Sequence, residues 1–267
     1  MSKVVLITGA SSGIGQAIAQ FLVNHSYTVY GTSRNPKNSV ENGVHMLALD
    51  VTKPETITTA VATLLKAEGK IDYLINNAGM GITGPLEETP DTETRRVFET
   101  NYFGALEVIK AVLPTMRAQR SGMVINITSI AGYMGLPYRG IYSATKGALG
   151  ITTEAYRMEL KEFNVKMTTV APGDFATNIA AGRYHAPVLD NSPYKDNYKN
   201  TLALMDEHVD KGMDTAIMAK VIKRVMESKN PKVHYRVGFF MQRFSIALKR
   251  MLPDTWYEKL LLNHYGL

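Results

Sequence analysis

Short apolar runs alternate with helix-like segments along most of this 267-residue chain, and that alternation constrains the fold more than any other feature. The runs are rich in Val and Ile and nearly continuous, as in strands that are buried on both faces. A repeating β-α-β order predicts an α/β fold, a doubly wound parallel sheet of about seven strands. The predicted strands are residues 4–7, 28–31, 45–49, 73–76, 123–127, 166–170 and 233–237, and the predicted helices are residues 14–24, 54–67, 91–119, 143–163 and 215–228.

Two segments depart from this rhythm within what we expect to be a single domain over residues 1–267. Residues 177–211 contain no clear strand and several turn-forming residues, which is typical of a functional loop, and we expect a substrate lid there. Residues 239–267 predict a C-terminal helical extension, with Phe240, Phe244, Ala247 and Met251 on one helical face. Three roles are open for such a face: packing on the body or on a second subunit, lining the substrate entrance, or anchoring to a lipid surface. We favour the first two of these three roles over the lipid anchor.

The first predicted strand runs directly into a glycine-rich loop and then into a helix. A tight turn, a close approach to phosphate and close helix-strand packing each require a glycine in such a loop. The N-terminus of the helix adds free N–H groups and a positive dipole end. This context predicts a Rossmann-type dinucleotide site built from Gly9, Ser11, Ser12, Gly13, Ile14 and Gly15.

The end of the second predicted strand indicates which dinucleotide binds. An acidic residue there would bind the ribose 2′-hydroxyl of NAD, but the sequence instead has Ser33 and Arg34. A guanidinium can donate two hydrogen bonds to a 2′-phosphate. We therefore predict NADP(H) as the cofactor.

Further residues, in the right order, make the chain resemble the classical short-chain dehydrogenase/reductase family. Residues 8–15 resemble its TGxxxGIG loop, residues 76–79 its NNAG element and residues 142–146 its YxxxK segment. The resemblance implies that Asn101, Ser129, Tyr142 and Lys146 form the catalytic set. It also implies cofactor contacts from Tyr142 and Lys146, and from Asp50, Val51, Asn77, Ala78, Gly79, Pro172, Gly173, Phe175 and Thr177.

The residue types of the catalytic set suit hydride transfer between a nicotinamide and a carbonyl or alcohol carbon. Tyr142 and Lys146 are spaced i, i+4 and share one helical face. A tyrosine normally ionises near pH 10, and a nearby ammonium favours the phenolate. Ser129 would polarise the substrate oxygen. The family resemblance implies that Lys146 also binds the nicotinamide ribose and that Asn101 holds a water in a proton relay.

Composition excludes several other classes. With no cysteine and no ligand spacing among six histidines, we predict no metal site. The net charge is +6, but residues 211–267 alone hold 11 Lys/Arg against 4 Asp/Glu, so we expect a solvated basic segment and no nucleic-acid partner. No apolar run is long enough for a transmembrane span or a signal peptide, and we expect a cytoplasmic protein. Relatives pair through two long helices, here residues 91–119 and 143–163, which implies a homodimer or homotetramer.

The expected pocket walls favour a bulky apolar carbonyl or alcohol substrate, and the named candidates are Ile82, Met134, Leu136, Pro137, Phe175 and Ile179. Within the family, the sequence of residues 133–141 and the presence of a C-terminal extension resemble the 17β-hydroxysteroid and retinol dehydrogenase branch. Two alternatives stay open. One is a 3-oxoacyl-thioester reductase of lipid synthesis, and the other is a non-catalytic NADPH-sensing protein.

Overall fold

The computed structural model describes residues 2–176, 182–210 and 212–267. Thr177 and Ile179, two residues of the predicted sites, lie outside these ranges. The strands are β1 Val4–Ile7, β2 Thr28–Ser33, β3 Val40–Glu41, β4 Val44–Ala48, β5 Tyr73–Asn76, β6 Ile82–Thr83, β7 Gly122–Ile127, β8 Val165–Pro172, β9 Tyr184–His185 and β10 His234–Val237. The helices are α1 Gly13–Val23, α2 Pro54–Glu68, α3 Asp91–Phe98, α4 Gly104–Gln119, α5 Gly140–Glu159, α6 Lys195–Asp210, α7 Thr215–Met226, α8 Phe240–Met251 and α9 Asp254–Tyr265.

The predicted doubly wound sheet is confirmed. Within the described residues its order is β10-β8-β7-β5-β1-β2-β4-β3. All neighbouring strands in it pair in parallel except β3, a two-residue edge strand that pairs antiparallel with β4 and was not predicted. The order reverses on either side of β1, so the carboxyl ends of β1 and β5 border the crevice where such sheets bind ligands.

Helices cover both faces of this sheet, which is why β1 is apolar at every position. Val5 and Ile7 pack into the cluster beneath α1 and α7. Val4 and Leu6 point to the other face and join the cluster beneath α2 and α4. Alternate side chains of a strand point to opposite faces, so a strand between two helical layers has no solvent-facing position.

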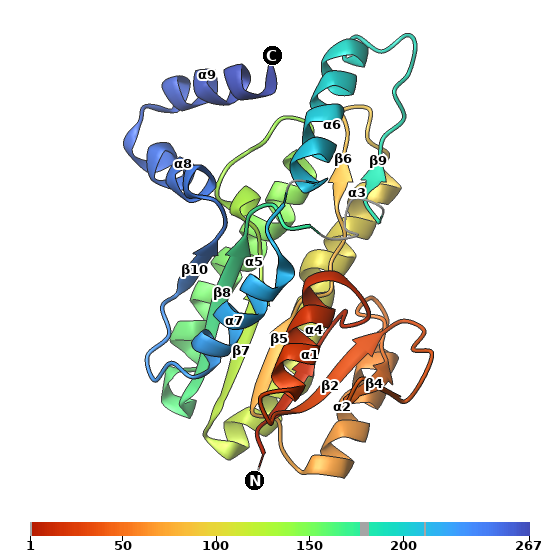
Figure 1. Cartoon of the computed structure of the whole chain (residues 1–267), viewed down its shortest axis with the longest axis vertical. Coiled ribbons are helices and arrows are strands. Elements are labelled where there is room, and N and C mark those ends of the chain that lie inside the picture. Colours follow the sequence, from red (N-terminus) through yellow and green to blue (C-terminus); the bar gives the residue numbers. More distant parts are fainter. Residues whose placement is uncertain (1, 177–181, 211) are drawn as a thin grey trace.

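Three elements that the sequence did not predict, α6, β6 and β9, lie at the same end of the molecule as the predicted C-terminal extension (Figure 1). Figure 1 shows α6, β6 and β9 on one side of that end and α8 and α9 on the other. β6 and β9 pair in parallel although about 100 residues separate them in the chain. The prediction of a segment without regular structure over residues 177–211 was wrong for α6. Tyr198, Thr201 and Met205 are buried along one face of this helix, with the helical spacing i, i+3, i+7. Most of the other residues of the helix are polar, so the apolar periodicity is weak in the sequence.

The predicted continuous helix over residues 91–119 is interrupted. A π-helical turn, Glu99–Phe103, separates α3 from α4. A π turn accommodates one extra residue, and such turns are frequent at functional sites. Asn101 lies within this turn and is buried.

Candidate active site

The glycine loop after β1 has the backbone geometry that a dinucleotide site requires. Gly9 and Gly13 adopt positive φ angles of 66° and 56°, which side chains with a Cβ rarely adopt. A Cβ on Gly15 would lie 2.2 Å from the carbonyl oxygen of Gly9. Glycine is therefore required at all three positions, two for backbone conformation and one for contact with the loop.

The loop after β5 braces the glycine loop through Asn77. Its side-chain amide donates to the carbonyl oxygens of Thr8 and Gly9, at 3.0 and 2.9 Å. In return, the Thr8 hydroxyl oxygen accepts the backbone N–H groups of Asn77 and Ala78, both at 3.0 Å. Asn77 thus acts on the loop that would hold the cofactor, a role that the sequence pattern did not reveal.

The phosphate end of the site lies at the N-terminus of α1. Ser11 and Ser12 are exposed there, and the described contacts give the Ser12 side chain no capping hydrogen bond. The helix dipole and the N–H groups of the first turn therefore face outward, where an anion can bind.

The end of β2 brings together the residues predicted to choose the cofactor. The Ser33 hydroxyl is buried without a hydrogen-bond partner, and Arg34, next along, is exposed. Burial opposes ionisation of Asp50, but hydrogen bonds from Thr52 and the charges of Lys53 and Arg34 hold the Asp50 pKa below its ordinary value. Asp50 and Arg34 are thus electrostatic neighbours.

Val51 has a different environment from Asp50. It is buried in the cluster beneath α2 and α4. A Cβ on Gly104 would lie 2.8 Å from the Val51 side chain. The packing of Val51 on the start of α4 fixes the loop after β4.

Asn101 is held from both sides in the π turn. Its amide oxygen accepts the N–H of Met80 at 2.8 Å, and its amide nitrogen donates to the carbonyl oxygen of Met80 and to the Thr145 hydroxyl, at 2.9 and 3.2 Å. A Cβ on Gly79 would lie 3.1 Å from the amide oxygen of Asn101 and 3.4 Å from the ammonium nitrogen of Lys146. Gly79 is therefore the point at which Asn101 and Lys146 converge.

Tyr142 and Lys146 occupy one buried face of α5. Lys146 donates to the carbonyl oxygen of Ile127 at 3.0 Å, and its nitrogen lies 5.9 Å from the centre of the Tyr142 ring. Burial lowers the pKa of Lys146, and the neighbouring Tyr142 opposes that shift. The predicted i, i+4 pair is thus a buried lysine beside the ring of a buried tyrosine.

Ser129 completes the predicted set at the carboxyl end of β7. It caps a 3₁₀ turn, Ile130–Tyr133, where its hydroxyl oxygen accepts the N–H of Ala131 at 3.1 Å. Because that bond uses an oxygen lone pair, the hydroxyl hydrogen can still be donated to a substrate oxygen.

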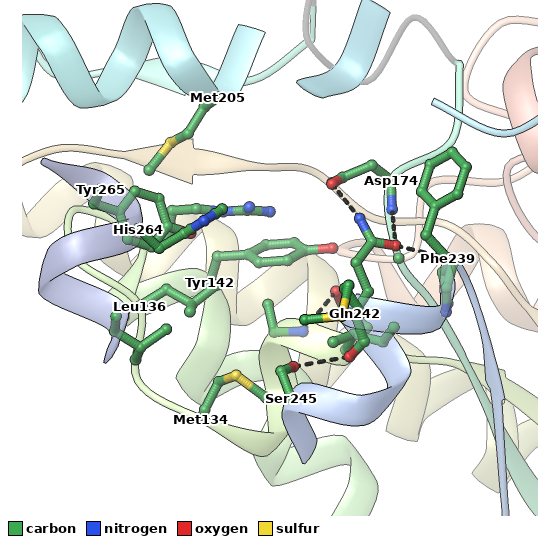
Figure 2. A pocket seen from close by; sticks show the side chains of 18 of the residues that line it. Met134, Leu136, Tyr142, Asp174, Met205, Phe239, Gln242, Ser245, His264 and Tyr265 are labelled. Atoms are coloured by element: carbon green, nitrogen blue, oxygen red, sulfur yellow. Dashed lines mark hydrogen bonds between the residues drawn. The ribbon is translucent and has the colours of Figure 1, made fainter. Parts of the chain in front are cut away.

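A cavity of about 580 Å³ opens in front of Tyr142 and Ser129. Figure 2 shows the Tyr142 ring in this cavity, between Met205 of α6 and Met134. Of the predicted apolar wall residues, Ile82, Met134, Leu136 and Phe175 line the cavity. Pro137 is not among the residues of the wall. Of the cofactor residues predicted on this side, Ile14, Pro172 and Gly173 border the same cavity.

The C-terminal extension forms much of the cavity wall. Its lining residues are Phe239, Met241, Gln242, Ser245, Leu248, Tyr257, Leu260, Leu261, His264 and Tyr265. The apolar face predicted for α8 does not pack on the body of this chain. Phe240, Phe244 and Met251 are 67%, 41% and 78% exposed, whereas Ile246, on another face, is 1% exposed. Periodicity identified an apolar face, but the helix docks through Ile246 and its pocket-side residues.

Gln242 links α8 to the loop after β8, a contact that could not be predicted from the sequence. Its amide nitrogen donates to the Asp174 carboxylate at 2.5 Å. Its amide oxygen accepts the N–H groups of Asp174 and Phe239, at 3.4 and 3.2 Å (Figure 2). A Cβ on Gly173 would lie 2.1 Å from that oxygen. Gly173 is therefore required for Gln242 to approach.

Arg139 is a second residue that sequence reasoning missed. Its guanidinium lies 5.5 Å from the centre of the Tyr142 ring. Burial raises the pKa of Tyr265, near the end of α9, and the positive charge of Arg139 opposes that shift. Arg139 thus lies between Tyr142 and the end of the C-terminal extension.

A dinucleotide loop, a buried tyrosine-lysine pair and a serine facing one cavity define an oxidoreductase that uses a nicotinamide cofactor. The family model of the short chain dehydrogenases matches residues 3–187. The chain belongs to this family, and the predicted class, an NADP-dependent dehydrogenase/reductase, is confirmed.

Individual relatives cover almost the whole chain. A protein of Bacteroides thetaiotaomicron named 3-ketodihydrosphingosine reductase is 38% identical over 99% of this chain and 98% of its own length. A mouse protein, dehydrogenase/reductase SDR family member 7B, is 34% identical over 96% of this chain and 80% of its own. A crystal structure of a short-chain dehydrogenase from Streptomyces avermitilis, 31% identical, superposes with a TM-score of 0.84 over 100% of this chain and 96% of its own. The structure of ElxO with NADP bound has a TM-score of 0.71 at 29% identity over 89% of this chain and 96% of its own.

No helix in the described part of the chain is long and apolar enough to cross a membrane. Among the same residues, no group of three or more His, Asp or Glu side chains is arranged to hold a metal ion.

Proposed function

We propose that this chain reduces a ketone carried on a long apolar molecule, with NADPH as the reductant. The observation that carries the proposal is the position of Tyr142 and Ser129 on a cavity of about 580 Å³ whose other walls are mainly apolar. Such a cavity suits a substrate with one polar reacting group and a large hydrophobic remainder. The reductase from Bacteroides thetaiotaomicron is named for a ketone of this kind, a sphingoid base with a long alkyl chain.

The residues around the glycine loop fit NADP(H) in particular. The unpartnered, buried hydroxyl of Ser33 and the exposed Arg34 lie where a ribose 2′-phosphate would bind. A Cβ on Gly9 would lie 3.0 Å from the Cα of Ala78, so the loop leaves no room for a side chain beneath the cofactor. When bound, NADPH supplies the hydride.

The catalytic set divides the remaining work. Ser129 donates its hydroxyl hydrogen to the substrate oxygen and polarises the carbonyl group. Tyr142 gives its phenolic proton to that oxygen as negative charge develops there. The ammonium of Lys146 lies beside the resulting phenolate and favours it. Asn101 holds a water that returns a proton towards Lys146, and the support for this step is that both side chains adjoin Gly79.

Of the predicted lid segment 177–211, the structure describes residues 182–210, and this part serves as the lid of the site. Arg183 and Met205 come from that segment and line the cavity, which supports the assignment. A second subunit is expected against α4 and α5, where Phe103, directly before α4, and Ile151 and Met158 of α5 are exposed apolar residues. An isologous contact would cover them.

The test is consumption of NADPH, followed by absorbance, with long-chain sphingoid ketones, steroid ketones, retinal and 3-oxoacyl thioesters. We expect turnover of long-chain ketones, and Tyr142→Phe should lower kcat by about 10²- to 10⁴-fold while leaving NADPH affinity nearly unchanged. A preference for the thioester would instead favour a 3-oxoacyl-thioester reductase of lipid synthesis. A preference for steroid ketones or retinal would favour an enzyme like the 17β-hydroxysteroid and retinol dehydrogenases. Full activity of Tyr142→Phe would refute the mechanism.

Cofactor choice has a separate test. Arg34→Asp replaces a phosphate-binding cation by a carboxylate that can accept the 2′-hydroxyl of NADH. We expect the ratio of kcat/KM for NADPH over NADH to fall by at least about 10²-fold, as for loss of a charge-assisted hydrogen bond together with new repulsion. An unchanged ratio would contradict the role of Arg34.

A further inference from the structure

A group of large apolar side chains lies exposed on the two C-terminal helices. On α8, Phe240 and Phe244 stack with ring centres 5.6 Å apart, and Met251 continues the same face. On α9, Trp256 and Leu260 are 63% and 47% exposed. We call these five residues, with Phe239 and Met241, the C-terminal apolar surface.

This surface is continuous with the mouth of the cavity. Phe239, Met241 and Leu260 are 48%, 65% and 47% exposed, and each also lines the cavity. Figure 1 shows α8 and α9 together at one end of the molecule, away from β4 on the opposite side of the sheet. A body that covered this surface would therefore also border the route into the active site.

The charges around this surface are mainly positive. Along α8, Arg243 and Arg250 are exposed and lie beside the Phe240–Phe244 face, and the helix has no acidic residue. Of the two acidic residues on α9, Asp254 is paired with Lys249 and Glu258 is exposed. Exposed aromatic residues flanked by arginines are typical of helices that lie in a membrane interface.

A second copy of the chain fits this surface less well. An isologous contact would bring the Arg243 and Arg250 side chains of two copies together, and bringing like charges together costs free energy. It would also cover the cavity mouth on both copies. An anionic lipid surface pairs with the same arginines and accepts the same aromatic side chains.

We infer that the C-terminal apolar surface docks this protein on anionic lipid bilayers, with the mouth of the cavity facing the lipid. Phe240, Phe244 and Trp256 enter the interface between headgroups and acyl chains, while Arg243 and Arg250 contact the headgroups. A hydrophobic substrate then passes from the bilayer into the cavity without crossing water. The docking surface does not depend on which ketone is reduced.

The experiment is co-sedimentation of the full chain, without substrate or cofactor, with vesicles of phosphatidylglycerol and phosphatidylcholine or of phosphatidylcholine alone. We expect binding to the anionic vesicles and much weaker binding to the neutral ones. Arg243→Gln/Arg250→Gln should weaken the binding by about 20- to 30-fold. The control Lys37→Gln/Lys53→Gln removes the same charge from exposed sites near the other sheet edge and should bind like the wild type.

Phe240→Ser/Phe244→Ser tests the apolar part, with Val40→Ser, an exposed apolar residue on β3, as its control. We expect at least about a tenfold loss for the double variant, since each buried phenyl group stabilises the bound state, and none for the control. Two results would overturn the inference: no binding to anionic vesicles, or equal losses in the control variants. Absence of vesicle binding is then combined with the sedimentation coefficient of Phe240→Ser/Phe244→Ser, which a self-association surface would change. Such a change would assign the surface to a second copy.

Discussion

Replacing Gln242 with Leu should release α8 from the loop after β8 while leaving the rest of the fold intact. The substitution preserves much of the side-chain volume but removes the hydrogen bond to the Asp174 carboxylate and the two bonds that the amide oxygen accepts from Asp174 and Phe239. The leucine would leave a carboxylate oxygen and two N–H groups to water. The contact between the C-terminal extension and the loop that includes Gly173 would be lost.

The magnitude follows from the kind of bond that is lost. A hydrogen bond to a charged group contributes about 1.5–3 kcal/mol. Water at this partly exposed site can bind the two freed backbone N–H groups and so recovers part of the free energy of the bonds they lose. We therefore expect the docking of α8 to weaken by about 2 kcal/mol, which is about a 30-fold change in its opening equilibrium. β1 and β5 lie at the centre of the sheet and share no described hydrogen bond with Gln242, so their stability should hardly change.

Amide hydrogen exchange, resolved by peptide, measures this directly. Exchange in α8 should accelerate by about 30-fold, and exchange in β1 and β5 should stay at the wild-type rate. The KM for NADPH should also rise, because the loop of Gly173 loses its support. Arg243→Leu, which removes the exposed neighbour of Gln242, serves as the control and should leave both readings unchanged. Exchange in α8 within about twofold of the wild type would refute the clamp, since an equilibrium shift of 2 kcal/mol is far larger.

Three further outcomes are expected. Gly15→Ala would place a Cβ 2.2 Å from the Gly9 carbonyl oxygen. Overpacking of this kind costs about 1–3 kcal/mol, so we expect a 10- to 100-fold loss of NADPH affinity in fluorescence titrations. An unaltered affinity would contradict the role of the glycine. Burial opposes ionisation of Asp72, but hydrogen bonds from Lys3, from the Val4 N–H and from Lys70 lower its pKa below 3.8. A depressed pKa contributes stability above the unfolded value, so Asp72→Asn should be destabilising in urea unfolding at pH 7, and the difference should shrink as the pH falls below 3.8; a constant difference would exclude the linkage. Ile151→Glu/Met158→Glu should reduce the sedimentation coefficient if α5 forms the subunit contact, and identical sedimentation of both proteins would rule that contact out.

The sequence by itself determined the parts of this protein that depend on local rules. Strands buried on both faces need continuous apolar residues, so β1 and β5 were predicted with their observed bounds. Positive φ angles at Gly9 and Gly13 are requirements of single residues, and they are visible in the sequence as glycine. The pair Tyr142 and Lys146 lies on one helix at i, i+4, so their proximity followed from helical geometry alone.

Only the tertiary structure decided how distant segments complete the site. Asn101 pairs with the backbone of Met80, and Gln242 with Asp174, across 21 and 68 positions of the chain. The exposed face of α8 has the same apolar periodicity as a buried one, so the pattern identified the face but not what covers it. Periodicity reports only which residues share a face. Which face is buried depends on the packing free energy of segments that meet in the folded chain, and here α8 buries Ile246 and leaves Phe240 and Phe244 at the surface.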